Sequence, residues 1–321
     1  MGSSKSVVLA ALFANAAIAV LKFGGFLLTA SPSMLSETYH SVSDTGNQVF
    51  LLIGIRYGGR EATRRHPFGY GKAQFFYSFV VAMLLFGIAG WESAKHGFSV
   101  LTAHGGGHGA GGSAEFLGFV FTPPANFDPV FVNYAVLLGA IGFESYAFKK
   151  AHAEMSRQID ENGWSGFREA FHKTSDATTL TALTEDTIAL VGLVLALAGI
   201  FLTQQTGIEA FDAAAALLIG VMLMGFALAL AWENKRLILG ESLPEADERE
   251  LHRIVAEHDG VERVVDFRTV YFGPERVVVA ADVEFTPDLD TGEIDDRITA
   301  IEDALRDANE GVRKVYIEPE T

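Results

Sequence analysis

A histidine and an aspartate four residues apart lie inside one of the long apolar stretches of this sequence. They are His40 and Asp44, within the segment Ser36–Asp44. Four residues make about one turn of α-helix, so a helix would project both side chains from the same face. Ionisable groups at the depth of a bilayer cost several kcal/mol unless they are paired or hydrated. The pair is therefore a candidate functional site.

Further carboxylates occur in two other apolar stretches. Glu185 and Asp186 are adjacent in the segment Leu183–Ala189, and Glu144 stands in a separate run. One imidazole and several carboxylates form a nitrogen and oxygen site, which suits Zn²⁺ best and also accommodates Mn²⁺, Fe²⁺ or Co²⁺. The chain has no cysteine, which excludes thiolate ligands and disulfides. The alternative is a hydrogen-bond network between helices that holds no ion.

The elements that carry these residues are predicted to be membrane-spanning helices. A bilayer-spanning helix needs about 20 mostly apolar residues. Lys5 precedes the first apolar run as in a signal peptide, but that run continues past Lys22 and is too long for one. The six runs are Ser6–Ala30, Ser33–Tyr57, Phe75–Lys95, Val130–Phe148, Thr179–Thr203 and Phe211–Trp232.

The distribution of basic residues predicts the orientation of the spans. Lys and Arg concentrate between spans two and three, between spans four and five, and directly after span six. Cytoplasmic loops carry this excess, so both termini are expected in the cytoplasm, with the protein in the cell membrane. The formal net charge is −16 and the sequence pI about 4.9, which argues against nucleic-acid binding.

The last quarter of the chain reads as a separate soluble domain. Residues 241–321 contain 23 Asp or Glu against 9 Lys or Arg, so most of the negative charge lies there. Amphipathic and alternating patterns predict an α-β-β-α-β order, which favours a ferredoxin-like α+β fold. We expect domains at residues 1–240 and 241–321. The five elements are Pro244–Glu257, Val261–Tyr271, Arg276–Phe285, Ile294–Asp307 and Gly311–Ile317.

The connection Gly97–Asp128 is long and rich in glycine. It contains His104 and His108, which in a flexible chain would capture a metal ion only weakly. Ordering a glycine-rich segment on binding costs a large conformational entropy. A tether with incidental histidines is the favoured interpretation of this loop.

Three segments together make the sequence recognisable. They are Ser33–Gln48, with the sequence SMLSETYHSVSDTGNQ, His66–Lys72, with HPFGYGK, and Leu183–Gly192, with LTEDTIALVG. Over almost its whole length the chain resembles the cation diffusion facilitator family of divalent-metal transporters, in particular the zinc-transporter-nine-type branch. The resemblance implies six spans, a ferredoxin-like cytoplasmic domain, a homodimer, and metal export in exchange for protons.

The resemblance also implies a metal site in the membrane. The family's transport site takes two residues four apart in span two, which here are His40 and Asp44, and two more in span five. Asp186 fills the second of these, but the first falls on Ala182, which cannot bind a metal. Glu185 is the expected fourth ligand, although it lies about 100° around the helix from Asp186. A role for Glu185 in helix packing or proton handling is the alternative.

Other metal sites of the family look incomplete in this sequence. At the second site His66 is present without ligand neighbours, so it reads as a loop residue. Lys72 matches a family lysine that pairs with an acidic group between protomers. The positions beside His66 hold Thr63 and Tyr70. The C-terminal domain lacks most of the imidazoles that bind metal in the family, so its charged side chains are interpreted as solvated. Its residues concerned are His252, His258, Asp282, Tyr316 and Glu318.

We therefore expect a Zn²⁺/H⁺ antiporter, not an enzyme, with no resident cofactor. Its expected partners are divalent metal ions, protons, the lipid bilayer and a second copy of the chain. Glu144 is a candidate proton relay or a polar clasp between helices. One alternative is a transporter of Mn²⁺, Fe²⁺ or Co²⁺, and another is a membrane-anchored assembly protein with a vestigial metal site. An intramembrane metalloprotease is discounted because the chain has no HExxH motif.

Overall fold

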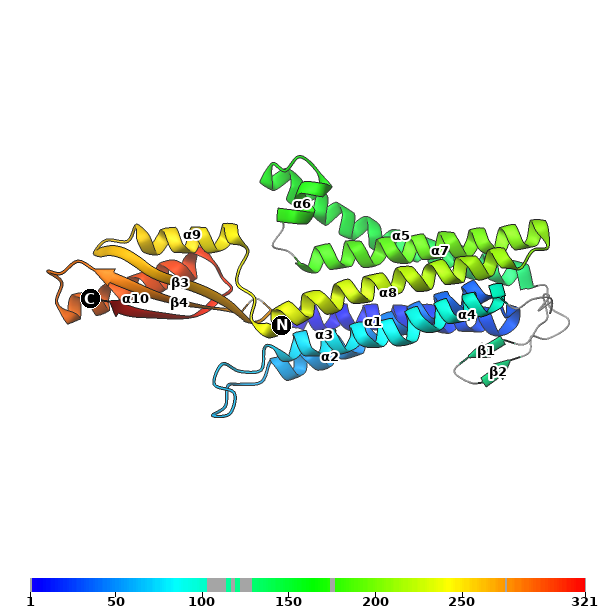
Figure 1. Ribbon diagram of the computed structural model, residues 1–321, viewed down its shortest axis with the longest axis horizontal. Coiled ribbons are helices and arrows are strands. Elements are labelled where there is room, and N and C mark those ends of the chain that lie inside the picture. Colours follow the sequence, from blue (N-terminus) through cyan, green and yellow to red (C-terminus); the bar gives the residue numbers. More distant parts are fainter. Residues whose placement is uncertain are drawn as a thin grey trace. The chain divides into compact units, whose positions relative to one another are not determined.

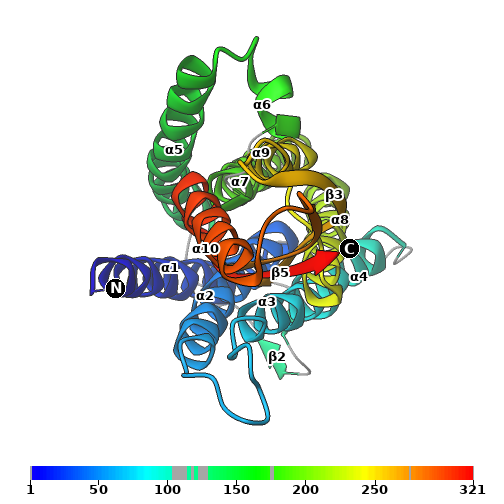
Figure 2. The same ribbon diagram turned by 90° about the vertical axis from the view of Figure 1, so that its left-hand side faces the viewer.

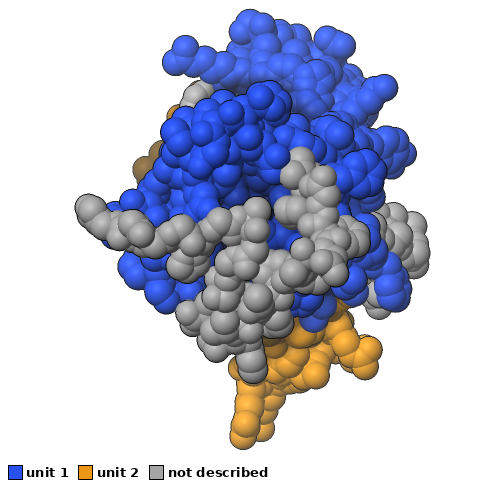
Figure 3. Space-filling view, turned by 90° about the vertical axis from the view of Figure 1, so that its right-hand side faces the viewer, with its two compact units in different colours: residues 1–49, 80–230 blue, residues 50–79, 231–321 orange. Residues whose placement is uncertain are grey.

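The structure is a computed structural model that describes residues 2–102, 114–116, 119–121, 129–173, 177–274 and 276–320. The chain divides into two compact units, coloured blue and orange in Figure 3. Unit 1 comprises Met1–Val49 with Val80–Leu230, and unit 2 comprises Phe50–Phe79 with Ala231–Thr321. Each unit has a hydrophobic core of its own.

Each of the six expected spans falls on a long helix (Figure 1). The third span is one continuous helix in three parts, in which a π-helical turn, η1, joins two α-helical segments. Such turns occur mostly as short interruptions inside α-helices. The spans correspond to α1 (Gly2–Thr29), α2 (Pro32–Gly58), α3 (Ala73–Leu84) with η1 (Leu85–Gly90) and α4 (Trp91–Thr102), α5 (Pro129–Asn162), α7 (Ala177–Thr206) and α8 (Ala210–Leu239).

Four of these helices are long and apolar enough to cross a membrane. They are Ala73–Thr102, Phe131–Glu161, Leu183–Thr206 and Ala210–Leu239. Within α1, residues Asn15–Thr29 form a shorter apolar helix. Helix α2 is not among these four, and its first half carries Glu37, His40 and Asp44. The candidate site thus lies on a helix whose apolar sequence is interrupted by ionisable residues.

Unit 1 is built from large side chains at the helix contacts and glycines where two helices come very close. Its core includes Leu137 of α5, Leu193 of α7 and Leu223 of α8, all fully buried. A Cβ on Gly97 of α4 would lie 2.6 Å from the backbone oxygen of Ala213 in α8. Small residues that let backbones approach in this way are typical of helix packing in membranes. The third span and α8 are therefore held at close range.

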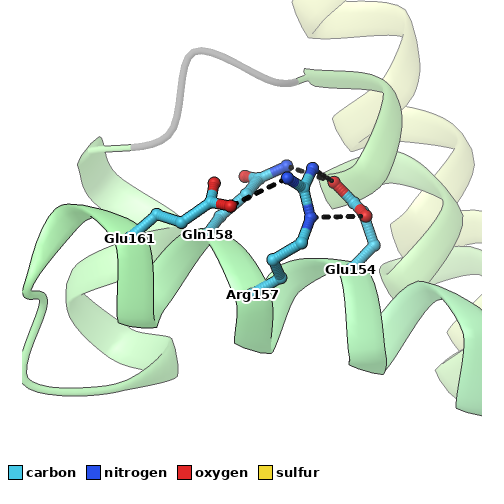
Figure 4. A network of polar contacts seen from close by, with 4 residues as sticks. All are labelled: Glu154, Arg157, Gln158 and Glu161. Atoms are coloured by element: carbon cyan, nitrogen blue, oxygen red, sulfur yellow. Dashed lines mark hydrogen bonds and ion pairs between the residues drawn. The ribbon is translucent and has the colours of Figure 1, made fainter.

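Helix α5 extends well beyond its apolar part. Its last turns are polar. Arg157 forms an ion pair with Glu154 and another, of 2.9 Å, with Glu161, and the Gln158 side chain donates a hydrogen bond to Glu154 (Figure 4). These side chains are spaced three and four residues apart, the spacing at which helix surface pairs meet. The short helix α6 (Phe167–Lys173), which the sequence analysis did not anticipate, follows after a turn.

The C-terminal part of unit 2 has the predicted α-β-β-α-β order. The sheet runs β3-β4-β5, with β3 and β4 antiparallel and β4 and β5 parallel. Helices α9 and α10 pack against each other and against this sheet (Figures 1 and 2). The fold class predicted from the sequence is confirmed; the elements are α9 (Glu245–Ala256), β3 (Val261–Gly273), β4 (Arg276–Phe285), α10 (Thr291–Ala308) and β5 (Val312–Glu320).

Local signals explain why these elements form. Apolar residues of β4 alternate into the core, where Val279 and Val283 are fully buried against Leu251 of α9 and Leu305 of α10. Helix α10 begins with a capping box. The Asp290 carboxylate accepts hydrogen bonds from the backbone N–H groups of Gly292 and Glu293, and the Glu293 carboxylate accepts one from the backbone N–H of Asp290. The amphipathic period and the cap together fix where this helix starts.

The long connection after α4 is described only in part. Two short strands, β1 (Ala114–Phe116) and β2 (Phe119–Phe121), pair antiparallel there, a hairpin that the sequence analysis did not anticipate. The histidines expected to be incidental in this loop, His104 and His108, lie outside the described residues.

Candidate functional site

His40 and Asp44 face each other along one side of α2, as their spacing predicted. Nε2 of the imidazole and Oδ2 of the carboxylate are 3.6 Å apart, and the side chains are 3% and 16% exposed. This distance is longer than a hydrogen bond. The two groups therefore adjoin each other without being bonded together.

Four buried polar atoms on this face of α2 have no hydrogen-bond partner among the described residues. They are both ring nitrogens of His40, the Oε1 atom of Glu37 one helical turn before it, and the Oε1 atom of Gln48 about two turns after it. Buried polar atoms in proteins are nearly always hydrogen-bonded, so each exception calls for a specific explanation. A nitrogen and a carboxylate oxygen with free lone pairs are the atoms that a divalent cation would bind.

The carboxylates of other helices add negative charge around this face. Glu144 of α5 and Asp186 of α7 both act electrostatically on Asp44, and so does Glu37. Glu185 of α7 in turn interacts with Asp44, Asp186 and Glu144. Carboxylates from three helices therefore contribute to one field, which favours a cation inside an otherwise apolar bundle.

The four expected ligands are not drawn into one coordination shell. Within the described part of the chain, no three His, Asp or Glu side chains lie close enough together to hold a metal ion. Glu185 and Asp186 are neighbours on α7 and therefore point in different directions around its axis. His40 and Asp44 are the two that the structure brings side by side, while the α7 and α5 carboxylates interact electrostatically with Asp44.

Sequence reasoning missed the residue that pairs with Glu37. The ammonium of Lys22, on α1, donates a hydrogen bond of 2.8 Å to Oε2 of Glu37, and the two side chains are 1% and 0% exposed. Two sequence signals were available. Lys22 interrupts an apolar run, and Glu37 stands one turn before His40 on the same helix face.

The start of α2 is fixed by an aspartate at the start of α8. Asp212 accepts 2.7 Å from the hydroxyl of Ser31 and 3.3 Å from the backbone N–H of Ser33. Ser31 also accepts from the backbone of Met34 at 3.2 Å, which caps the first turn. The backbone N–H of Asp212 donates to the hydroxyl of Thr203, at the end of α7. These bonds set the position of the face that carries His40.

The residues at the position of the family's second site form a small packed loop in unit 2. The His66 ring lies 4.3 Å from the Tyr70 ring, and the Tyr70 hydroxyl is 3.3 Å from that of Thr63. Lys72 donates to the backbone oxygen of Ile238 at 3.2 Å and lies over the ring of Phe272. The His66 ring is thus engaged in packing within its loop.

The histidines of the C-terminal domain lie on its outer surface. His252 packs edge-on against Phe267 with ring centres 5.5 Å apart, and the ring of His258 contacts the backbone oxygen of Asp259. Asp282 and Glu318 are register partners on β4 and β5. Neither histidine joins them in a group of three that could hold a metal ion, within the described residues.

Comparison with known proteins identifies the family. The family model described as the cation efflux transmembrane domain matches residues 8–239, and that described as the cation efflux protein, cytoplasmic domain, matches residues 243–321. The chain belongs to the cation diffusion facilitator family. The resemblance drawn from the three sequence segments is thereby confirmed, and so is a membrane domain followed by a cytoplasmic dimerisation domain.

Several members of the cation diffusion facilitator family are similar over most of this chain. Metal tolerance protein C4 of Arabidopsis thaliana is 24% identical over 282 residues, 88% of this chain and 57% of that protein. The human proton-coupled zinc antiporter SLC30A9, mitochondrial, is 25% identical over 279 residues, 87% of this chain and 45% of its own length. The chain thus spans about half the length of these relatives. The cation-efflux pump FieF of Pectobacterium atrosepticum is 23% identical over 281 residues, 86% of this chain and 80% of that protein.

Proposed function

We propose that this protein exports divalent metal ions, with Zn²⁺ as the main substrate, in exchange for protons. The observation that carries the proposal is one face of α2, where buried His40, whose ring nitrogens make no hydrogen bond among the described residues, stands beside Asp44, and where carboxylates of α5 and α7 act on Asp44. An imidazole with carboxylates is a donor set that favours Zn²⁺ over harder cations. A relative named as a proton-coupled zinc antiporter supports both the metal and the exchange.

The proposed ligands are His40, Asp44 and Asp186, with Glu185 as the fourth. In the described structure these groups are too far apart to form one shell, so binding requires α2 and α7 to draw the carboxylates together. The metal-bound site and the protonated site then each favour one of two arrangements of the helices, and alternating access requires two such arrangements. Ala182, the position where the family has a ligand, carries only a methyl group, which leaves the fourth place to Glu185.

Proton exchange follows from the chemistry of the same groups. Imidazole and carboxylate must lose their protons to bind a metal, so metal entry releases protons from the site. Protons arriving from the opposite side then compete for His40 and the carboxylates and release the metal. Histidine suits this exchange because its ordinary pKa lies near neutrality. We assign Glu144, on α5, the role of a proton relay that carries protons to and from this cluster.

We further propose that both termini are cytoplasmic, that the protein resides in the cell membrane, and that it works as a homodimer. The Lys and Arg residues of the loops support the orientation, and the match of residues 243–321 to the family's cytoplasmic domain supports dimerisation. The functional division then falls at residue 240, with transport in residues 1–240 and dimerisation in 241–321. Broader selectivity for Mn²⁺, Fe²⁺ or Co²⁺ is the nearest alternative, because the set is rich in oxygen.

A flux measurement in proteoliposomes tests the proposal. Vesicles loaded with a zinc-sensitive dye are given external Zn²⁺ with or without an outward proton gradient, and we expect uptake that the gradient accelerates. Asp44→Asn removes a proposed ligand with little change of shape and should abolish this uptake. Glu161→Gln, at the exposed end of α5, is the matched control and should retain it. If the protein forms dimers normally but transports no ion, the result would instead favour a membrane-anchored assembly protein.

A further inference from the structure

The buried ion pair of Lys22 and Glu37 joins α1 to α2, one helical turn before His40. Both side chains are almost completely shielded, and the ammonium bonds to only one of the two carboxylate oxygens. The other oxygen, Oε1, has no partner among the described residues. It is directed at α7, where a Cβ on Gly192 would stand 2.7 Å from it. The glycine therefore leaves room for the carboxylate at this point.

The positive charge of Lys22 acts on the proposed metal site. It interacts electrostatically with His40, with Asp44 and with Glu144. Glu37 acts on the first two with the opposite sign. The site for a divalent cation thus contains a resident cation, and repulsion between like charges is strong where water is excluded.

A transport site must bind its ion firmly enough to load it and weakly enough to release it. Five carboxylates and an imidazole bind a divalent ion more tightly, and release it more slowly, without a neighbouring ammonium than with one. We propose that Lys22 sets the affinity of the transport site, by opposing the charge of the bound metal ion and partly neutralising Glu37. This inference rests on the proposed function, since it assumes that the cluster is where the ion binds.

A purely structural role for the pair makes different predictions. If the bond between Lys22 and Glu37 only clamped α1 to α2, loss of either partner would leave one buried charge and disturb the site in the same direction. If the charges set affinity, the two losses act in opposite directions. Removing the ammonium strengthens metal binding, and removing the carboxylate weakens it.

Zinc affinity of the purified full-length protein distinguishes these roles, measured by competition with a fluorescent chelator. We expect Lys22→Gln to bind Zn²⁺ about tenfold more tightly and Glu37→Gln about tenfold more weakly, because one unit charge acts on a doubly charged ion across neighbouring helices. Lys22→Arg keeps the charge and should stay near wild type. In proteoliposomes Lys22→Gln should lower both the KM and the maximal rate, since tight binding slows release.

Three results would overturn the inference. They are an unchanged affinity in Lys22→Gln, a shift of both single variants in the same direction, or a Lys22→Arg protein that behaves like Lys22→Gln. If Lys22→Gln does not fold, the exchange Lys22→Glu with Glu37→Lys keeps the pair and moves the positive charge to within one turn of His40. That protein should bind Zn²⁺ about tenfold more weakly; wild-type affinity in it would also refute the proposal.

The proposed function fails in a different way. If wild-type protein binds no Zn²⁺, or if the double variant His40→Ala with Asp44→Asn binds it as wild type does, the ion binds elsewhere and both proposals fall. If that double variant loses binding while Lys22→Gln keeps the wild-type affinity, only the role of Lys22 is refuted.

Discussion

The α2 face of unit 1 and the surface of the C-terminal domain carry similar chemical groups in opposite surroundings. On α2, His40 is 3% exposed and neither ring nitrogen makes a hydrogen bond among the described residues. In the C-terminal domain, His252 and His258 lie at the surface, each in contact with a neighbouring group. Acidic residues outnumber basic ones in both regions.

The difference shows that burial, more than residue type, marks a site. A carboxylate in water is stabilised by its hydration, so a surface rich in Asp and Glu needs no further explanation. The same group inside an apolar bundle costs free energy that only a partner or a bound cation offsets. The C-terminal acids therefore indicate a solvated surface, whereas those of α2, α5 and α7 make the bundle interior the candidate for a cation site.

The largest expected effect comes from making one substitution in both regions. His40→Ala removes a proposed metal ligand, and we expect Zn²⁺ flux to fall by more than the roughly 10- to 100-fold lost when a residue that only orients a ligand is changed. His252→Ala removes a surface imidazole that packs on Phe267, and flux should stay near wild type. Stopped-flow uptake by proteoliposomes measures both. Equal loss in the two proteins would refute the contrast between the regions.

The next effect concerns the choice of metal. Adding an imidazole at position 182 completes the family-like set, so Ala182→His should raise the preference for Zn²⁺ over Mn²⁺ by about tenfold. Glu185→Gln should weaken binding of both ions, because it removes a charged oxygen ligand. Competition of Mn²⁺ against Zn²⁺ uptake in the three proteins measures this. If Glu185→Gln transports Zn²⁺ as wild type does, Glu185 is not a ligand.

A smaller effect is expected from salt on the C-terminal domain. Residues 241–321 enclose their own core and carry an excess of negative charge, so screening by salt should raise the melting temperature of that fragment by several degrees. Zn²⁺ should not raise it. A bound ion at a hundred times its Kd would add about 2.7 kcal/mol and shift the melting temperature by more than about 10 °C. Such a shift in calorimetry would show a metal site in this domain.

The smallest effect concerns Asp247, in the first turn of α9. Burial raises the pKa of this carboxyl above its ordinary value. The folded state therefore holds the proton more tightly than the unfolded state, and this contribution to stability is lost as pH rises through the raised pKa. Between pH 4 and 7 the melting temperature of Asp247→Asn should fall by about 2 °C less than that of the wild type. The difference is small because the positive end of the helix dipole favours the charged carboxylate and so opposes the effect of burial. An unchanged slope would exclude this group as its source.

Much of this fold follows from local patterns. The alternation of Val277, Val279, Ala281 and Val283 predicted β4, and these residues are the ones buried in the core. Six apolar runs predicted the six long helices because each run is continuous over about the thickness of a bilayer. The spacing of His40 and Asp44 likewise predicted their common face, since four residues fix the angle around a helix.

The remainder depends on contacts between distant segments. The pairing of Lys22 with Glu37 joins two helices, and which faces of α1 and α2 meet is decided by packing that neither segment specifies alone. The distance between the α7 carboxylates and Asp44 has the same origin, so the sequence could name candidate residues for a site but could not predict their separation. The hairpin of β1 and β2 was missed because each strand is only three residues long.

The cluster around Asp212 has a mechanical consequence. It ties the start of α2, the start of α8 and the end of α7 at one point, so a tilt of α2 against α7 would pivot there. With a rise of about 1.5 Å per residue, Glu37 lies roughly 6 Å along α2 from Ser33, and Asp44 roughly 16 Å. The same angular movement then displaces Asp44 more than twice as far as Glu37. A small tilt of α2 therefore moves Glu37, the partner of Lys22, only slightly, and moves Asp44, a proposed metal ligand, much further.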